Sequence, residues 1–137
     1  MTTITVVSGS YRYLTLEEHL EYPGFKYVTT SESKYVDESG KTVVVPVGFL
    51  TDGCSGGPDY GRSWLIHDYL YSTHQFTTGE ECTRREADKI MEKVLSHEGL
   101  MLYRLSFFIV IKLNPCCVFS NAWNSSGDKG AIFLEEY

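Results

Sequence analysis

The chain has 137 residues, of which 42% are hydrophobic and 22% are charged, a balance typical of a globular protein with enough chain to bury a core. Its formal net charge of −6 argues against a non-specific nucleic-acid binder, because such proteins usually present a basic surface to phosphate. The length predicts a single domain over residues 1–137.

The sequence predicts neither a secretory signal nor a transmembrane segment. Residues 1–13 lack a basic region followed by a long apolar run. The most apolar stretch, residues 100–113, is too short to cross a bilayer and carries Arg104 and Lys112. Without a secretion signal, the four cysteines are expected to be free thiols, and no Cys-x-x-Cys pair favours structural zinc.

The N-terminal half is predicted to be mainly β-structure. Residues 2–7 alternate β-branched side chains, which indicates a short strand, whereas residues 14–22 fit one amphipathic helical turn or two. Residues 25–36 and 41–50 are predicted to form an antiparallel hairpin around an Asp-Glu-Ser-Gly turn. Pro46 cannot donate a ladder hydrogen bond, so we expect it at a sheet edge or near a strand end.

Three helices are predicted after the hairpin, at about residues 62–74, 84–98 and 100–113. The second has the clearest ends, because Thr83 and Glu86 fit a capping box and a glycine follows its last turn. Its predicted apolar stripe consists of Ala87, Ile90, Met91, Val94 and Leu95.

The last part of the chain carries weaker signals. Residues 120–129 are rich in Ser, Asn and Gly and are predicted to be a loop, and residues 131–134 could add a final strand. Together the elements predict an α+β fold in which a small antiparallel sheet, built on the hairpin of about residues 25–50, packs against about three helices.

A glycine-rich segment lies between the hairpin and the first long helix. Residues 51–61 hold four glycines and one proline, so this backbone suits either a plain surface connection or a loop that approaches a ligand closely. Asp52 and Asp59 lie in the loop and Asp68 lies in the following helix. Carboxylates beside exposed carbonyls are what a hard cation such as Ca²⁺ uses.

His67 and Asp88 are the main candidates for chemistry. A histidine on one helix and an aspartate on its neighbour can form a general base and the group that orients it. No Gly-x-Ser-x-Gly motif is present, which favours an activated water over a covalent intermediate. Alternatively, His67, Asp68, Tyr71 and Asp88 form a structural hydrogen-bond network between helices. The other histidines, His19, His74 and His97, are expected at the surface.

Three motifs in this order resemble a phage-associated domain family of unknown function. They are Pro46-x-Gly48-Phe49-x-Thr51-Asp52, His67-Asp68-x-x-Tyr71 and Arg85-x-Ala87-Asp88, within about residues 45–113. The resemblance implies a viral or prophage origin and a location in the virion or the host cytoplasm, without an established activity.

A second, local resemblance is to secreted phospholipase A2. It rests on His67-Asp68-x-x-Tyr71 after a glycine-rich loop, with Asp88 on a later helix. The resemblance implies that His67 activates water, that Asp68 binds Ca²⁺ with loop carbonyls, and that Tyr71 and Asp88 hold the histidine. The loop residues that this would place at the ion are Gly53, Gly56 and Gly57, with Asp52 as a further oxygen donor.

The leading hypothesis is therefore a viral phospholipase A2-like hydrolase, assisted by Ca²⁺ and acting on phospholipid or at a membrane surface. Ser63, Trp64 and Leu70 stand where that family has half-cystines, which motivates an alternative. In the alternative, the chain is a non-catalytic virion or host-interaction protein that contacts other virion proteins. A third hypothesis is a metal-dependent hydrolase of another bond, with Asp52, His67 and Asp68 as ligands.

Overall fold

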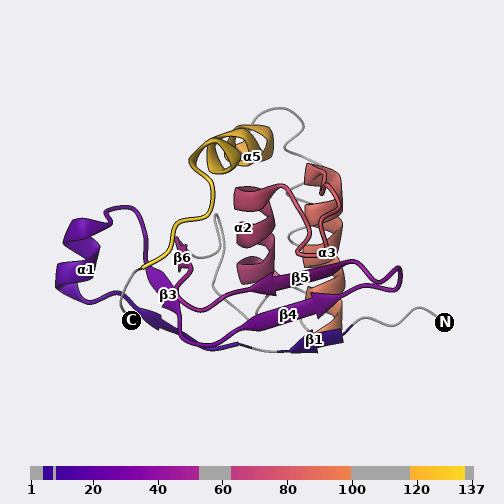
Figure 1. Cartoon of the computed structure of the whole chain (residues 1–137), viewed down its shortest axis with the longest axis horizontal. Helices are drawn as coiled ribbons and strands as arrows, with labels where there is room; N and C mark the ends of the chain where they lie inside the picture. Colours follow the sequence, from indigo (N-terminus) through magenta and orange to yellow (C-terminus); the bar gives the residue numbers. More distant parts are fainter. Residues whose placement is uncertain (1–4, 8, 53–62, 100–117, 135–137) are drawn as a thin grey trace.

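The computed structural model describes residues 5–7, 9–52, 63–99 and 118–134. Within these residues the fold is α+β, with two three-stranded antiparallel sheets and four helices (Figure 1). The predicted fold class is confirmed. The helix predicted at residues 100–113 lies outside the described residues.

Both sheets grow from the predicted hairpin. The first sheet has the order β1–β4–β5, with β1 at Thr5–Val7, β4 at Ser33–Val36 and β5 at Thr42–Val45. The second has the order β2–β3–β6, with β2 at Tyr11–Tyr13, β3 at Tyr27–Thr29 and β6 at Leu50–Thr51. The hairpin is therefore present, but each of its arms is broken into two short strands that belong to different sheets.

The break in the second arm has a local cause. Pro46 follows the last residue of β5, as expected for a residue without an N–H group, and Gly48 takes a positive φ of 88°. Thr29 stabilises the break, because its Oγ1 donates to the Pro46 carbonyl at 2.7 Å and accepts from the Phe49 N–H at 2.9 Å.

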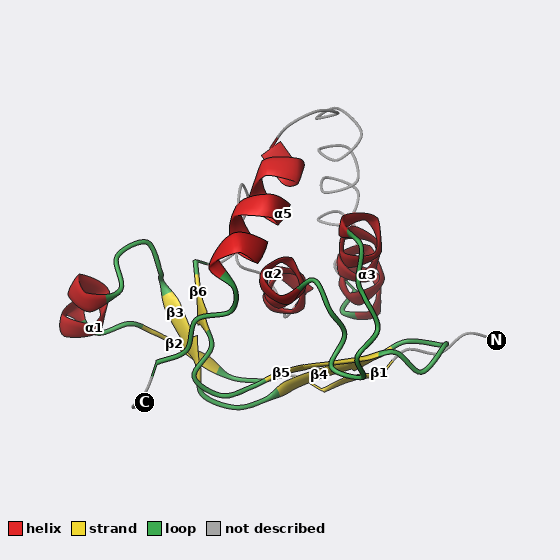
Figure 2. Cartoon of the chain, turned by 45° about the horizontal axis from the view of Figure 1, so that its top comes forward, coloured by secondary structure: helices red, strands yellow, loops and turns green. Residues whose placement is uncertain are grey.

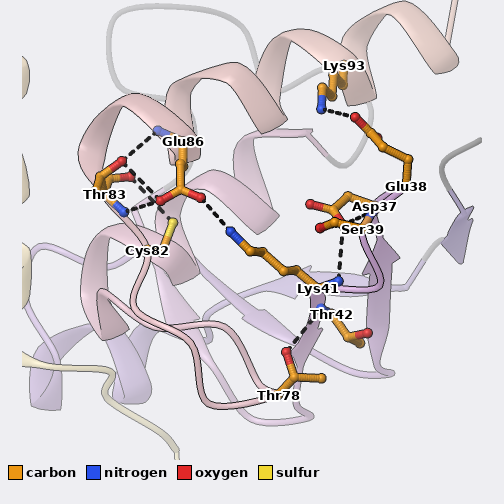
Figure 3. A network of polar contacts seen from close by, with 10 residues as sticks. All are labelled: Asp37, Glu38, Ser39, Lys41, Thr42, Thr78, Cys82, Thr83, Glu86 and Lys93. Carbon is orange, nitrogen blue, oxygen red and sulfur yellow. Dashed lines mark hydrogen bonds and ion pairs between the residues drawn. The ribbon is translucent and has the colours of Figure 1, made fainter. Parts of the chain in front are cut away.

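The turn of the hairpin is built by Asp37. Its Oδ1 accepts hydrogen bonds from the backbone N–H groups of Ser39 at 2.9 Å and Lys41 at 3.1 Å. Two ion pairs then join this part of the hairpin to α3: Lys41 Nζ lies 3.0 Å from Glu86 Oε2, and Lys93 Nζ lies 3.0 Å from Glu38 Oε1 (Figure 3). Largely exposed pairs of this kind contribute little stability.

Helices α2 (Ser63–Thr73) and α3 (Arg84–His97) lie side by side over the first sheet, and α5 (Val118–Lys129) packs against α2 (Figure 2). The predicted ends of α3 are confirmed, with a complete capping box at its start and Gly99 at φ 78° after its end. Its predicted apolar stripe is buried in the main core, together with Trp64, Leu65 and Leu70 of α2. Within the described residues, no helix is both long and apolar enough to cross a membrane.

The prediction of a loop at residues 120–129 is wrong, because this segment lies in α5. Its Ser, Asn and Gly residues have low intrinsic helix propensity, but Trp123 packs its ring edge-to-face on Tyr71 of α2, with centroids 5.1 Å apart. Tertiary packing therefore outweighs local preference. Residues 131–134 form no regular strand; Phe133 makes an isolated antiparallel bridge with Phe49.

The ambiguous stretch at residues 14–22 contains the short helix α1 (Leu16–Glu21). Thr15 and Glu18 form a capping box, and Arg12 binds both carboxylate oxygens of Glu18 at 2.7 and 2.9 Å. None of the α1 residues is buried, and Leu16 and Leu20 are 77% and 73% exposed. The helix projects from one end of the molecule (Figures 1 and 2).

Candidate functional site

The packing of α2 against α3 brings His67 and Asp88 together. His67 Nε2 lies 2.7 Å from Asp88 Oδ1, which is the distance of a strong hydrogen bond. Asp88 occupies the second turn of α3, on the flank of the buried stripe, and is itself buried at 6% exposure. The contact that the sequence predicted between the two helices is therefore present.

Tyr71 completes this group from the same face of α2 as His67. Its Oη donates to Asp88 Oδ1 at 2.7 Å, so one carboxylate oxygen receives both side chains. Burial, reinforced by the negative charge of Asp88, raises the pKa of Tyr71 far above its usual value. Tyr71 therefore stays neutral and remains a hydrogen-bond donor.

The contact with the Asp88 carboxylate requires a hydrogen on Nε2 of His67. When Nε2 carries the hydrogen that faces Asp88, the other ring nitrogen, Nδ1, carries the lone pair that can accept a proton. The His67 and Tyr71 rings lie 4.2 Å apart, and only 13% of the His67 side chain is exposed. The arrangement provides an imidazole that the Asp88 carboxylate holds in one orientation.

Two residues that pack next to Tyr71 were not among the predicted site residues. His74 was expected at the surface, but it is half-buried and contacts Trp123, which fell in the predicted loop. Trp123 touches both His74 and Tyr71, so α5 closes over the end of α2 nearest the candidate site. The lone tryptophan in a polar segment was the available signal, because a large aromatic side chain usually needs an apolar partner.

Asp68 belongs to a different surface of α2 from His67. It lines a cavity of about 130 Å³ between the segment after α1, strand β6, α2 and α5. The lining residues are Pro23, Gly24, Phe25, Leu50, Asp52, Asp68, Ser72, Ser126, Lys129, Gly130 and Ile132. Of the predicted metal ligands, Asp52 and Asp68 therefore share one cavity, whereas Gly53, Gly56 and Gly57 lie outside the described residues.

Asp68 is partly open to the cavity, yet its carboxyl group is strongly perturbed. Burial is the largest cause, and the negative charge of Asp52 adds to it, while a hydrogen bond from Thr51 opposes both. Together these effects raise the pKa of Asp68 to about 7. Near neutral pH a large fraction of this group is protonated, which is unusual for an aspartate.

The described residues do not make a calcium site by themselves. Ca²⁺ takes about six to eight oxygen ligands, and the cavity offers two carboxylates, one of them partly protonated. Lys129 lines the same cavity, and its positive charge opposes a bound cation. Across the described part of the chain, no group of three or more His, Cys, Asp or Glu residues could hold a metal.

Cys82 is a free and buried thiol next to the start of α3. Burial, together with the negative charge of Glu86, raises the pKa of Cys82 to about 12 (Figure 3). Because the thiolate is the reactive form, this cysteine is unsuited to act as a nucleophile. Cys54, Cys116 and Cys117 lie outside the described residues.

Comparison with known proteins gives one family match. A family model described as "Protein of unknown function (DUF1353)" matches residues 27–109, which is more than half of the chain. The matched segment includes the four strands β3 to β6 and the helices α2 and α3. It therefore contains His67, Asp68, Tyr71 and Asp88. No curated protein and no solved structure matches the chain.

Proposed function

The chain belongs to DUF1353, a family of proteins of unknown function, and we propose that it is a hydrolase in which His67 is the general base toward water. The observation that carries the proposal is the shared oxygen of Asp88, which binds both His67 Nε2 and Tyr71 Oη at 2.7 Å. A buried carboxylate held by two side chains fixes the imidazole in one orientation and one tautomer.

The proposed reaction is ester hydrolysis. His67 Nδ1 takes a proton from water while the water oxygen attacks the carbonyl carbon of the ester. Asp88 stabilises the imidazolium that forms, and the imidazolium then gives its proton to the leaving alkoxide, so that ester and water become acid and alcohol. His67 is the catalytic residue in this scheme, and Asp88 and Tyr71 are positioning residues.

The proposed substrate is a phospholipid presented at a lipid surface, as in phospholipase A2. Three exposed apolar side chains support a lipid contact: Leu16 and Leu20 on α1 and the adjacent Tyr13, at 77%, 73% and 68% exposure. The net charge of −6 favours zwitterionic over anionic lipid. We further propose a phage or prophage origin, with the protein in the virion or the host cytoplasm, on the motif resemblance alone.

The test is hydrolysis of phosphatidylcholine in mixed micelles, with a panel of soluble esters, by the full chain and by His67→Gln. We expect the substitution to lower the rate by about 10²–10⁴-fold, which is the usual contribution of a general base. His97→Gln is the matched control, because His97 is an exposed histidine in the last turn of α3. An unchanged rate in His67→Gln would remove the proposal.

The same assay tests the predicted calcium dependence. Loss of activity in EDTA, restored by Ca²⁺, would mean that oxygen ligands beyond Asp52 and Asp68 complete a site. An unchanged rate in EDTA would show that the His67 base works without calcium.

A non-catalytic role is the second candidate, and the burial of the pair favours it. His67 and Asp88 side chains are only 13% and 9% exposed and join α2 to α3 in the way that a structural network would. In this case the chain would be a virion or host-interaction protein that contacts other virion proteins. Absence of turnover by the wild-type chain, with a lower melting temperature for His67→Gln and co-purification with virions, would favour this role.

A further inference from the structure

The cavity beside Asp68 carries opposite charges that do not pair with each other. Asp52 lines it from the residue after β6, Asp68 lines it from α2, and Lys129 lines it from the last turn of α5. Lys129 forms no ion pair with any residue that the structure describes. Lys129 and Asp68 therefore lie in one small cavity without a salt bridge between them, which suits a ligand that carries both charges.

The acidic part of the lining consists of Asp68 with Asp52 close by, and Thr51 fixes the Asp68 carboxyl group through a hydrogen bond. An ammonium group placed there would relieve the repulsion between the two carboxylates and compensate the burial of Asp68. It would also donate up to about three hydrogen bonds to these oxygens.

The same cavity also offers a partner for an anion. Lys129 supplies the positive charge, and Ser126, one turn before it on α5, lines the same space. The lining also includes the apolar side chains of Phe25, Leu50 and Ile132. A short hydrocarbon chain could pack on these side chains, so the cavity offers partners for both charges and for methylene groups.

We propose that this cavity binds a small zwitterion, with its ammonium group at Asp52 and Asp68 and its anionic group at Lys129. The cavity measures about 130 Å³, which gives room for a small ligand, because a volume of about 150 Å³ holds a molecule such as benzene. An ω-amino acid with two or three methylene groups has suitable size and charge.

The binding site is independent of the general base proposed above, because Asp68 and Ser72 line the cavity whereas His67 and Tyr71 bind Asp88. Failure of one proposal therefore leaves the other standing. A zwitterion also suits this cavity better than a metal ion, because its anionic group can pair with Lys129, whereas the charge of Lys129 repels a metal ion.

The test is a titration of the ¹⁵N-labelled full chain followed by amide chemical shifts, at about pH 8, where Asp68 is mostly ionised. The probes are β-alanine and 4-aminobutyrate, with propylamine and propionate as controls that carry one charge each, and Ca²⁺ as a competing cation. We expect saturable shifts at Asp68, Ser72, Lys129 and Gly130 with at least one zwitterion. Binding of each single-charge probe should be at least about tenfold weaker.

Variants separate this site from general surface binding. Asp68→Asn and Lys129→Met should each weaken zwitterion binding by about tenfold or more. Asp128→Asn and Lys89→Met are matched controls on exposed positions of α5 and α3 and should leave the affinity unchanged. Lys129 lies at the end of a helix, so Lys129→Met keeps the test valid if Asp68→Asn unfolds the chain.

The proposal is overturned if neither zwitterion gives saturable shifts, or if propylamine or propionate binds as tightly as the zwitterions. Tighter binding of Ca²⁺ than of any zwitterion at the same amides would also overturn it. An unchanged affinity in Lys129→Met would also overturn the proposal, because the anionic group of the ligand would then have a partner other than Lys129.

Discussion

The imidazole ring of His74 lies flat against the indole ring of Trp123, with ring centroids 3.7 Å apart and an interplanar angle of 4°. The His74 Nε2 also lies 2.8 Å from the Trp123 backbone oxygen. His74 directly follows α2 and has a φ of 55°, a left-handed backbone conformation that is uncommon outside glycine. The stack therefore anchors α5 to the end of α2, next to Tyr71 of the candidate site.

This stack explains a glycine in the last turn of α5, Gly127, and yields the first prediction. A Cβ atom at Gly127 would lie 2.3 Å from the His74 ring, which is closer than van der Waals contact allows. Replacing an interior helical glycine by alanine usually stabilises a helix by about 1 kcal/mol. Here we expect Gly127→Ala to lower the free energy of unfolding by about 1–3 kcal/mol, because overpacking outweighs propensity. Urea denaturation measures the change.

The control is the same substitution in a His74→Ala background. With the ring removed, Gly127→Ala should no longer destabilise the chain, because the overpacking against His74 is gone. A stabilising Gly127→Ala in the wild-type chain would show that the ring moves away freely in solution.

Helix α5 also shows which parts of the fold could not be predicted from the sequence. The ends of α3 and its buried face could be predicted because Thr83, Glu86 and the apolar stripe act within one helix. The helical state of residues 120–129 could not, since it depends on Trp123 contacting residues about 50 positions earlier in the chain. The same holds for the broken hairpin arms, where Thr29 binds the Pro46 carbonyl across the sheet.

Only part of the candidate site could be predicted from the sequence. Helical spacing placed His67 and Tyr71 on one face of α2, and Asp88 on the flank of the apolar stripe of α3. That the two helices pack with these side chains in contact was a hypothesis, and the structure shows the contact. The shared Oδ1 and the cavity at Asp68 depend on how α2, α5 and the sheets pack. No local pattern carries that information.

The second prediction concerns the hydrogen bond from Tyr71 to Asp88. Tyr71→Phe should lower the free energy of unfolding by about 1.5–3 kcal/mol, because it removes a hydrogen-bond donor from the buried carboxylate of Asp88. Chemical denaturation tests this, with Tyr69→Phe as control, because Tyr69 packs edge-to-face on Phe49. Equal effects of the two substitutions would mean that the Tyr71 hydroxyl contributes nothing specific.

The third prediction concerns Tyr35, which is fully buried in β4. Its hydroxyl has no hydrogen-bond partner within the described structure, and burial, with the negative charges of Asp37 and Glu38, raises its pKa well above the usual value. Tyr35→Phe should therefore raise the free energy of unfolding by about 1 kcal/mol, since an unsatisfied polar group is removed. The control is Tyr13→Phe at an exposed position, which should change nothing. A destabilised Tyr35→Phe variant would reveal a buried partner such as water.

The fourth prediction is a pH dependence of stability that arises from Asp68. The folded chain raises the pKa of this group from 3.8 to about 7, so between these values the folded state holds a proton that the unfolded state has released. Stability from this group is therefore highest at low pH, falls as the pH rises from about 4 to 7, and is lowest above that window. The charged groups that line the same cavity are Asp52, beyond β6, and Lys129 of α5.

Asp68→Asn removes this titration while it keeps the shape of the side chain. The variant should be more stable than the wild type by a few kcal/mol at about pH 8, and the difference should shrink toward zero near pH 4. Melting temperatures over this range give the measurement, and Asp128→Asn, at an exposed position of α5, should show no such trend. A difference that is constant with pH would mean that Asp68 is ionised throughout, and that Lys129 or a bound ion compensates its burial.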